Sequence, residues 1–158
     1  MTASTDLPKQ FRVDKPLVRA TGPDVVLVGS RTHLGLFTGG AWLVLGWHEI
    51  ERGSWNGETK TFKWLDLSGT AQTVRLDAAG RMPELFQERM HASTVFTFHY
   101  DLDHGAVSIV GRRSLADGTV RCYAVPSGGA DLTDPATARF VVAETDRLRS
   151  EYGLDWRL

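Results

Sequence analysis

The residues best suited to chemistry form one short run, HYDLDH, at residues 99–104. Its metal-binding side-chain types are His99, Asp101, Asp103 and His104. On a strand the first three would share one face, so their side chains could converge on one ion. No second cluster with ligand spacing occurs in the sequence, and a polar hairpin end with solvated side chains explains the same residues. We therefore predict no metal site and keep these four residues as the candidates for one.

Histidine and cysteine also serve in catalysis, and neither stands in a catalytic pattern here. His48 and Glu49 are neighbours on a predicted strand, so their side chains point to opposite faces and cannot act as one acid–base pair. Cys122 alternates with Val120 and Ala124, which predicts a thiol that faces the core. The sequence contains no hydrolase, zinc-protease or phosphate-loop motif. We therefore predict no catalytic residue, no cofactor and no enzyme activity.

A basic strand face is one candidate for binding. Arg112, Arg121 and Tyr123 would lie together on neighbouring strands, where they could meet phosphate groups of lipid or RNA. The alternative is the ordinary solvated face of an antiparallel sheet. The formal net charge of −1 adds no global attraction to nucleic acid or to an anionic membrane, so neither is expected as the main partner.

Tryptophan provides the other candidate for binding. Four of the five Trp residues fall between Trp42 and Trp64. Such rings are typical of a sheet core and of cross-strand pairs, and they can also line a groove for a ligand or partner. Trp55 is the best candidate for an exposed contact, because it stands beside the predicted Asn56-Gly57 turn.

The elements that would position these residues are mostly strands. Period-two patterns and turn residues predict five strands in the first half of the chain, at Val25–Ser30, Thr32–Phe37, Ala41–Ser54, Glu58–Asp66 and Gln72–Leu76. We expect the long third strand to bend at Gly46. Asn56-Gly57 predicts a two-residue type I′ hairpin turn, since both residues tolerate positive φ.

The second half of the chain adds two helices. Apolar residues at positions 82, 85, 86 and 90 predict a helix over Met82–Ser93. Three strands follow, at Thr94–Leu102, 106–113 and 119–125. Asp134 as N-cap and Pro135 at the first helical position begin a last helix that ends near Tyr152. Trp156 and Leu158 are expected to dock back on the body.

These patterns predict an α+β fold. It would be a bent antiparallel sheet or partial barrel of about seven or eight strands, with one helix after the fifth strand and a C-terminal helix. Residues 1–22 are polar and predict an extended arm, which would lie against the body through Phe11, Val13 and Leu17. Residues 23–158 are predicted to form a single domain, as suits a chain of 158 residues.

Composition indicates a soluble protein. Hydrophobic residues make up 42% of the chain and charged residues 23%, which is ordinary for a globular domain. The single Cys excludes an intrachain disulfide, and residues 1–16 lack the apolar segment of a signal peptide. No apolar run is long enough to span a bilayer, so we predict no transmembrane segment and a cytoplasmic location.

Two stretches of the chain resemble a known family. They are WHEIERGSWNGET at Trp47–Thr59, with the strand that follows to Trp64, and RMPELFQERMHASTV at Arg81–Val95. Both are similar to small uncharacterised proteins of actinobacteria that have a pleckstrin-homology-like (PH-like) domain. The resemblance implies a PH-like half-barrel and supplies neither an established activity nor functional residues.

The chain departs from that family pattern in two ways. Three strands are predicted after the first helix, whereas a plain PH fold ends with its C-terminal helix. The basic loop of a phosphoinositide binder is also missing. The predicted strands and turns over residues 24–38 contain one arginine, Arg31, no lysine, and one histidine, His33. Phosphoinositide binding is therefore not predicted.

Two functional hypotheses remain open. The first is a non-enzymatic cytoplasmic binding or scaffold module that contacts an unknown protein partner, through the strand face around Trp55 or through a sheet edge. Such an edge could also pair two copies into a homodimer. The alternative is a small-molecule-binding barrel or an enzyme that uses an aromatic pocket with His48 or His99 as its polar group.

Overall fold

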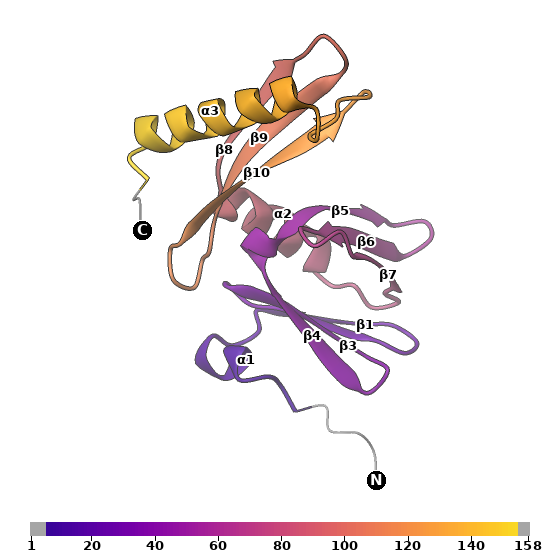
Figure 1. Ribbon diagram of the computed structural model, residues 1–158. Helices are drawn as coiled ribbons and strands as arrows, with labels where there is room; N and C mark the ends of the chain where they lie inside the picture. Colours follow the sequence, from indigo (N-terminus) through magenta and orange to yellow (C-terminus); the bar gives the residue numbers. More distant parts are fainter. Residues whose placement is uncertain (1–5, 155–158) are drawn as a thin grey trace. The chain divides into compact units, whose positions relative to one another are not determined.

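The computed structural model describes residues 6–154. Within that range ten strands form three antiparallel sheets, accompanied by three α-helices and one 3₁₀ turn (Figure 1). The α+β class with antiparallel sheets is therefore confirmed. The predicted strand number and single sheet are wrong, and the first long helix follows the seventh strand instead of the fifth.

The three sheets are separate and contain four, three and three strands. The first, in the order β1-β2-β3-β4, comprises β1 (Val18–Thr21), β2 (Val26–Gly29), β3 (His33–Thr38) and β4 (Ala41–Gly46). The second, in the order β5-β6-β7, comprises β5 (Ile50–Asn56), β6 (Thr61–Asp66) and β7 (Ala71–Arg75). The third, in the order β10-β9-β8, comprises β8 (Thr94–Asp101), β9 (Ala106–Arg113) and β10 (Val120–Ser127).

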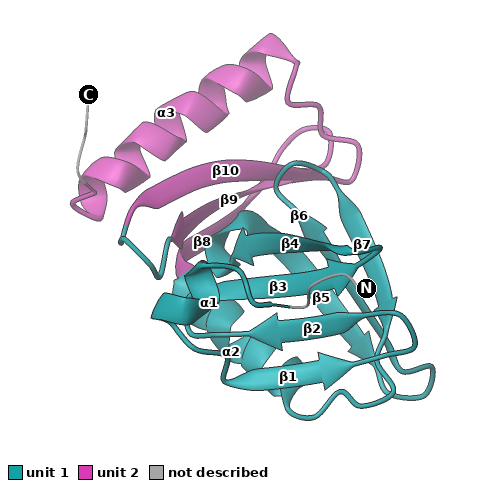
Figure 2. Cartoon of the chain, turned by 90° about the horizontal axis from the view of Figure 1, so that it is seen from below, with its two compact units in different colours: residues 1–93, 114–118 teal, residues 94–113, 119–158 magenta. Residues whose placement is uncertain are grey.

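The chain divides into two compact units (Figure 2). Unit 1 contains residues 1–93 and 114–118, and it holds the first two sheets with helices α1 (Gln10–Val13) and α2 (Met82–Ser93). Unit 2 contains residues 94–113 and 119–158, and it holds the third sheet with helix α3 (Pro135–Glu151). The single domain proposed for residues 23–158 stays a prediction.

The start of the described chain has more structure than an extended arm. Residues 6–22 include α1 and β1, and β1 is an edge strand paired with β2. Of the three predicted contacts with the body, Phe11 is buried at 1% exposure, while Val13 and Leu17 are exposed. Polar composition hid this strand, because an edge strand needs only one buried side chain, here Ala20, to be anchored.

The predicted long strand over Ala41–Ser54 is broken into β4 and β5 by the 3₁₀ turn Trp47–Glu49. Gly46 allows the break, because a Cβ there would lie 2.6 Å from Cε1 of His48. The turn is fixed from both sides: Glu49 Oε1 accepts the N–H of Gly46 at 2.9 Å, and buried Trp47 donates Nε1–H to the Ser30 carbonyl at 2.9 Å. The bend expected at Gly46 is thus a change of sheet.

The hairpin between β5 and β6 has a four-residue loop instead of the predicted type I′ turn. The last cross-strand pair is Asn56 with Thr61, and the positive φ falls on Lys60 at 54°. Asn56 Oδ1 accepts the N–H groups of Glu58 and Thr59, so its side chain organises the loop. The Asn-Gly pair therefore marked the turn correctly but not its type.

Unit 1 has an aromatic core. Trp47, Phe62 and Trp64 are at most 3% exposed, and Phe62 and Phe86 lie with ring centroids 4.9 Å apart. Phe62 and Trp64 on β6 and Val74 on β7 are buried at every second position, and Leu76 just after β7 is buried as well. Helix α2 supplies Met82, Leu85 and Phe86 to this core, as its apolar spacing predicted.

Unit 2 is a three-stranded sheet with α3 against one face (Figure 2). Phe96, Phe98 and Tyr100 alternate along β8 and share one face of it, because all three rings contact α3 or its C-cap. Its apolar cluster centres on Ile109 and Leu148, which are almost fully buried.

Helix α3 begins and ends as its sequence predicts. The Asp134 carboxylate accepts the N–H of Thr137 at 3.0 Å, Pro135 occupies the first position, and Gly153 follows with φ 64°. The predicted docking of Trp156 and Leu158 falls outside the described residues. No helix among residues 6–154 has the length and apolar character needed to cross a bilayer.

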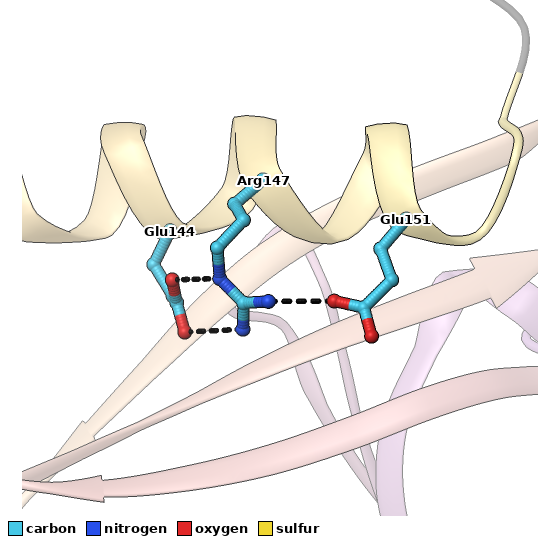
Figure 3. A network of polar contacts seen from close by, with 3 residues as sticks. All are labelled: Glu144, Arg147 and Glu151. Carbon is cyan, nitrogen blue, oxygen red and sulfur yellow. Dashed lines mark hydrogen bonds and ion pairs between the residues drawn. The ribbon is translucent and has the colours of Figure 1, made fainter.

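Polar bonds join α3 to the sheet of unit 2. Arg147 donates to both oxygens of Glu144, at 2.7 and 2.9 Å, and to Glu151 at 2.6 Å (Figure 3). The bonds from Arg147, followed by one from the Tyr100 hydroxyl, lower the pKa of Glu144 to about 2. Because Tyr100 belongs to β8, this carboxylate ties the helix to the strand beneath it.

Candidate functional site: a groove beside strand β5

A groove of about 570 Å³ runs between β5 and α2 in unit 1. Strand β5 contributes Arg52 to Trp55, and α2 contributes Pro83, Phe86 and Met90. The volume falls within the range of ordinary ligand sites. The groove has the chemical character of the neighbouring core, since aromatic rings form much of its surface.

Four rings form a continuous aromatic layer at the groove. Trp55 lies 6.1 Å from Phe62, Phe62 lies 4.9 Å from Phe86, and Phe86 lies 5.7 Å from Trp47, measured between ring centroids. Phe62 and Phe86 are buried, whereas Trp55 is only half-buried. The layer thus continues from the core to a partly exposed indole, which could contact a bound group without rearranging.

Gly53 permits this arrangement. A Cβ at Gly53 would lie 2.4 Å from Cζ of Phe86, closer than carbon atoms can approach. The missing side chain therefore lets the Phe86 ring lie directly on the backbone of β5. It also keeps that stretch of backbone accessible from the groove.

One edge of β5 is open. Strand β5 pairs with β6 on one side, and Arg52–Trp55 make no backbone hydrogen bond outside that pairing within residues 6–154. The backbone carbonyl of Lys60 accepts the N–H of Leu76 and so points toward the β7 side. Backbone groups of successive residues on β6 point alternately to its two neighbouring strands. Phe62 and Trp64 therefore bond to β7, and Lys63 and Leu65 bond to β5.

It follows which backbone groups of β5 face outward. Ser54 and Arg52 bond to their partners Lys63 and Leu65, which leaves the N–H and C=O groups of Gly53 and Trp55 on the open side. Both residues also line the groove. Unpaired strand groups beside an apolar groove are a template for another strand.

The charged side chains at the groove are in water. Arg52 is 73% exposed and lies 3.8 Å from Glu51, and Glu84 is 63% exposed and lies 3.9 Å from Arg81. Solvated ion pairs of this kind contribute little energy. They are suited to selecting a partner by charge.

The candidate metal residues are divided between two places in unit 2. His99 bonds Ser108 through Nδ1 at 3.0 Å and lies 3.5 Å from Asp101. Asp103 leaves the strand, because β8 ends at Asp101, and it lines a cleft of about 540 Å³ with Asp101 and His104. Among residues 6–154 no three His, Cys, Asp or Glu side chains are gathered so that they could hold a metal ion.

The basic strand face is present but is not an exposed cationic patch. Arg121 lies opposite Arg112 across the strand pair, and Tyr123 Oη lies 3.5 Å from Arg112 Nη1. Arg112 is only 2% exposed, while Arg121 is exposed and Tyr123 half-buried. The structure therefore places Arg112 beside Tyr123 and opposite Arg121 in the strand register, and it buries the Arg112 side chain.

The remaining candidates take structural positions. His48 lies in the 3₁₀ turn and packs over Gly46 instead of ending a strand beside Glu49. Cys122 contacts the unit 2 cluster as predicted, and Arg149 Nη1 lies 3.5 Å from its sulfur. Arg149 is a positive neighbour that alternation along the strand could not reveal.

Sequence reasoning identified Trp55 and missed the rest of the groove. Phe86 and Met90 were assigned to a helix face, but the strand beside that face could not be known from periodicity. Gly53 was a usable signal, because a glycine inside a strand pattern indicates a close approach.

Comparison of the chain with protein-family models, with curated proteins and with solved structures finds no match.

Proposed function

We propose that this protein is a non-enzymatic binding module that takes an extended segment of a protein partner into the groove beside β5. The observation that carries the proposal is the open edge of β5, with Gly53 and Trp55 facing an apolar groove. The segment would add a fourth strand to the β5-β6-β7 sheet.

In strand addition, backbone groups supply most of the affinity and side-chain contacts supply the selectivity. The outward N–H and C=O groups of Gly53 and Trp55 would bond any backbone. Alternate side chains of the segment would point into the groove, against Trp55, Phe86 and Met90. A suitable partner therefore carries large apolar residues at every second position.

We also propose that unit 1 is the PH-like domain that the resemblance implies. In support, Trp47–Trp64 lie entirely in unit 1, and α2 from the second stretch is its last helix. The three strands after α2, which a plain PH fold lacks, belong to unit 2 and so lie outside the proposed PH-like domain. The cytoplasmic location stays a prediction.

The binding proposal is tested by selecting extended peptides from a random library on the full chain and measuring their affinity. Trp55→Ala should weaken the selected peptide about tenfold or more, the usual effect of an aromatic contact residue. Trp42→Ala is the matched control, because Trp42 is also a half-buried strand tryptophan but lies on β4. Equal affinity of the Trp55 variant would contradict the site.

Amide hydrogen exchange tests the mode of binding. Bound peptide should slow exchange at the N–H groups of Gly53 and Trp55, which gain hydrogen bonds, more than at Ser54, which is already bonded to β6. A peptide that protects α2 alone binds as something other than a strand.

A second copy of the chain is an alternative occupant of the same edge. Sedimentation at rising concentration would then show a dimer that dissociates when the selected peptide is added. A strict monomer removes the homodimer and leaves the peptide site.

A further inference from the structure

Unit 1 contains a second cavity, of about 440 Å³, whose chemistry differs from that of the groove. It lies between the α1 segment, the turn that joins β2 to β3, and residues 115–116. Polar wall residues include Lys9, Arg31 and His33, and apolar ones include Val13 and Leu115. No sequence pattern indicated it, because its walls come from three distant segments.

A hydrogen-bonded chain holds His33 at this cavity. Thr32 donates its hydroxyl hydrogen to Asp14 Oδ2 at 2.8 Å, and the hydroxyl oxygen of Thr32 lies 2.8 Å from His33 Nδ1. A hydroxyl has a single hydrogen, so His33 must supply the hydrogen of the second bond from Nδ1. Burial lowers the pKa of His33, so the ring is neutral at pH 7 and Nε2 carries its lone pair.

The turn under His33 is rigid. Ser30 Oγ accepts the backbone N–H groups of Thr32 and His33, at 3.2 and 3.1 Å. The Ser30 carbonyl in turn accepts the indole N–H of buried Trp47. The imidazole is therefore placed before any ligand arrives, which reduces the entropy that binding must overcome.

Two cations at the cavity have no internal partner. Within residues 6–154, the side chains of Lys9 and Arg31 make no hydrogen bond or ion pair, although the Arg31 carbonyl accepts from Arg89. The cavity thus presents two positive side chains against one carboxylate, that of Asp14, which the Thr32 hydroxyl already occupies. The charges of the lining residues therefore sum to one positive charge, which is complementary to one negative charge, while Glu49 acts on His33 from outside the lining.

Two of the lining side chains are apolar, and one of them is largely exposed. Val13 is 91% exposed, and Leu115 is half-buried with its inner side on the unit 1 core. An exposed valine beside two cations that have no partner among the described residues suits a ligand with one charged end and a hydrocarbon body.

We propose that this cavity binds a small organic carboxylate, with its oxygens at Lys9 and Arg31 and its apolar part on Val13 and Leu115. A bound anion should raise the pKa of His33, because a negative charge close to the ring favours imidazolium, whose added proton comes from solvent. The charged groups that face His33 are Asp14, Glu49, Lys9 and Arg31, and the ligand adds a further negative charge to them.

The carboxylate could belong to a free small acid or to the C-terminus of a peptide, and the experiment separates these sources. The full chain is titrated by calorimetry with hexanoate and, as its neutral counterpart, hexan-1-ol. A short peptide ending in a free leucine carboxylate is compared with the same peptide as its C-terminal amide. Binding of hexanoate identifies a free acid, and binding of the peptide acid alone identifies a chain terminus.

The variant Lys9→Gln/Arg31→Gln should bind the carboxylate about tenfold more weakly or worse, as expected when charged contacts are lost. Arg19→Gln/Lys63→Gln removes the same charge from exposed positions of unit 1 and should leave affinity unchanged. Thermal melts confirm that both variants fold. The pKa of His33, followed by NMR, should rise when hexanoate saturates the protein.

Three results would overturn the proposal. The first is that neither acid binds at concentrations up to about 10 mM, which would still detect a Kd near the weak limit of specific binding. The second is that hexan-1-ol and the peptide amide bind as well as the corresponding acids. The third is that the two double variants weaken binding equally.

Discussion

Helices α2 and α3 are held against their sheets by different kinds of contact. Helix α2 has 12 residues and buries Met82, Leu85, Phe86 and Ser93, whereas α3 has 17 residues and fully buries only Leu148. The shorter helix is thus part of the core, and the longer helix lies on its sheet along a narrow line.

In unit 2, polar bonds compensate for the smaller apolar burial of α3. Glu144 connects Tyr100 on β8 with Arg147 on α3, and the rings of Phe96 and Tyr152 meet at the far end of the helix. Apolar burial is insensitive to pH and to moderate salt, while carboxylate bonds are sensitive to both. The two units should therefore respond differently to the same conditions.

The largest effect is expected from Trp47→Ala in unit 1. The indole is fully buried, contacts Phe86 and donates to Ser30, so its loss should cost about 4 kcal/mol of unfolding free energy. Amide hydrogen exchange should show faster opening of β2 and β3 than of β9. A loss below about 1 kcal/mol would mean that Trp47 does not anchor the unit 1 core.

Leu148→Ala is the counterpart in unit 2. It removes the one fully buried side chain of α3 and should cost about 3 kcal/mol. Exchange should accelerate in α3 and β9 more than in β2, the reverse of the Trp47 variant. Equal acceleration everywhere would show that the two units open as one body.

A smaller effect is expected from Asp134→Ala, which removes the N-cap of α3. The loss should be about 1 kcal/mol and should appear first as fraying of the initial helical turn. Asp131→Ala is a suitable control, since that carboxylate accepts from Thr133 before the helix begins. If the two variants are alike, the cap contributes nothing particular to α3.

The smallest effect at neutral pH should come from Glu144→Gln, and it should depend on pH. The pKa of Glu144 is about 2 in the folded chain and near 4.5 ordinarily, so its carboxylate stabilises unit 2 above pH 4.5. That stability is lost as pH falls from 4.5 to about 2, and the melting temperatures of wild type and variant should converge there. Convergence should also occur in high salt, because Arg147 is 56% exposed. A constant gap between pH 5 and 2.5 would contradict the role of the charge.

Local rules accounted for much of the secondary structure. Asp134 and Pro135 predicted the start of α3, since capping depends on neighbouring backbone alone, and the helix ends near Tyr152 as expected, with Gly153 at φ 64° after it. Period-two alternation also matches the buried positions of β6 and β7. The same rules failed at Ala41–Ser54, which they predict as one strand although the chain changes sheet at Trp47.

The candidate site was predictable only in part. Trp55 was correctly expected beside a turn and is half-buried there. The groove needs α2 alongside β5, and the second cavity needs Lys9 near His33, two residues 24 positions apart by their numbers. The spacing of residues along the sequence predicts neither the packing of α2 beside β5 nor the closeness of Lys9 to His33.

The sequence by itself determined where strands, turns and helix ends fall and which faces are apolar, because these depend on side-chain chemistry within a few residues. Over residues 6–154, the tertiary structure alone decided that ten strands form three sheets, that β5 keeps an open edge, and that Asp14, Thr32 and His33 join in one hydrogen-bonded chain. The physical reason is that distant segments compete for the same packing partners. Which contacts form therefore depends on the packing of the whole unit.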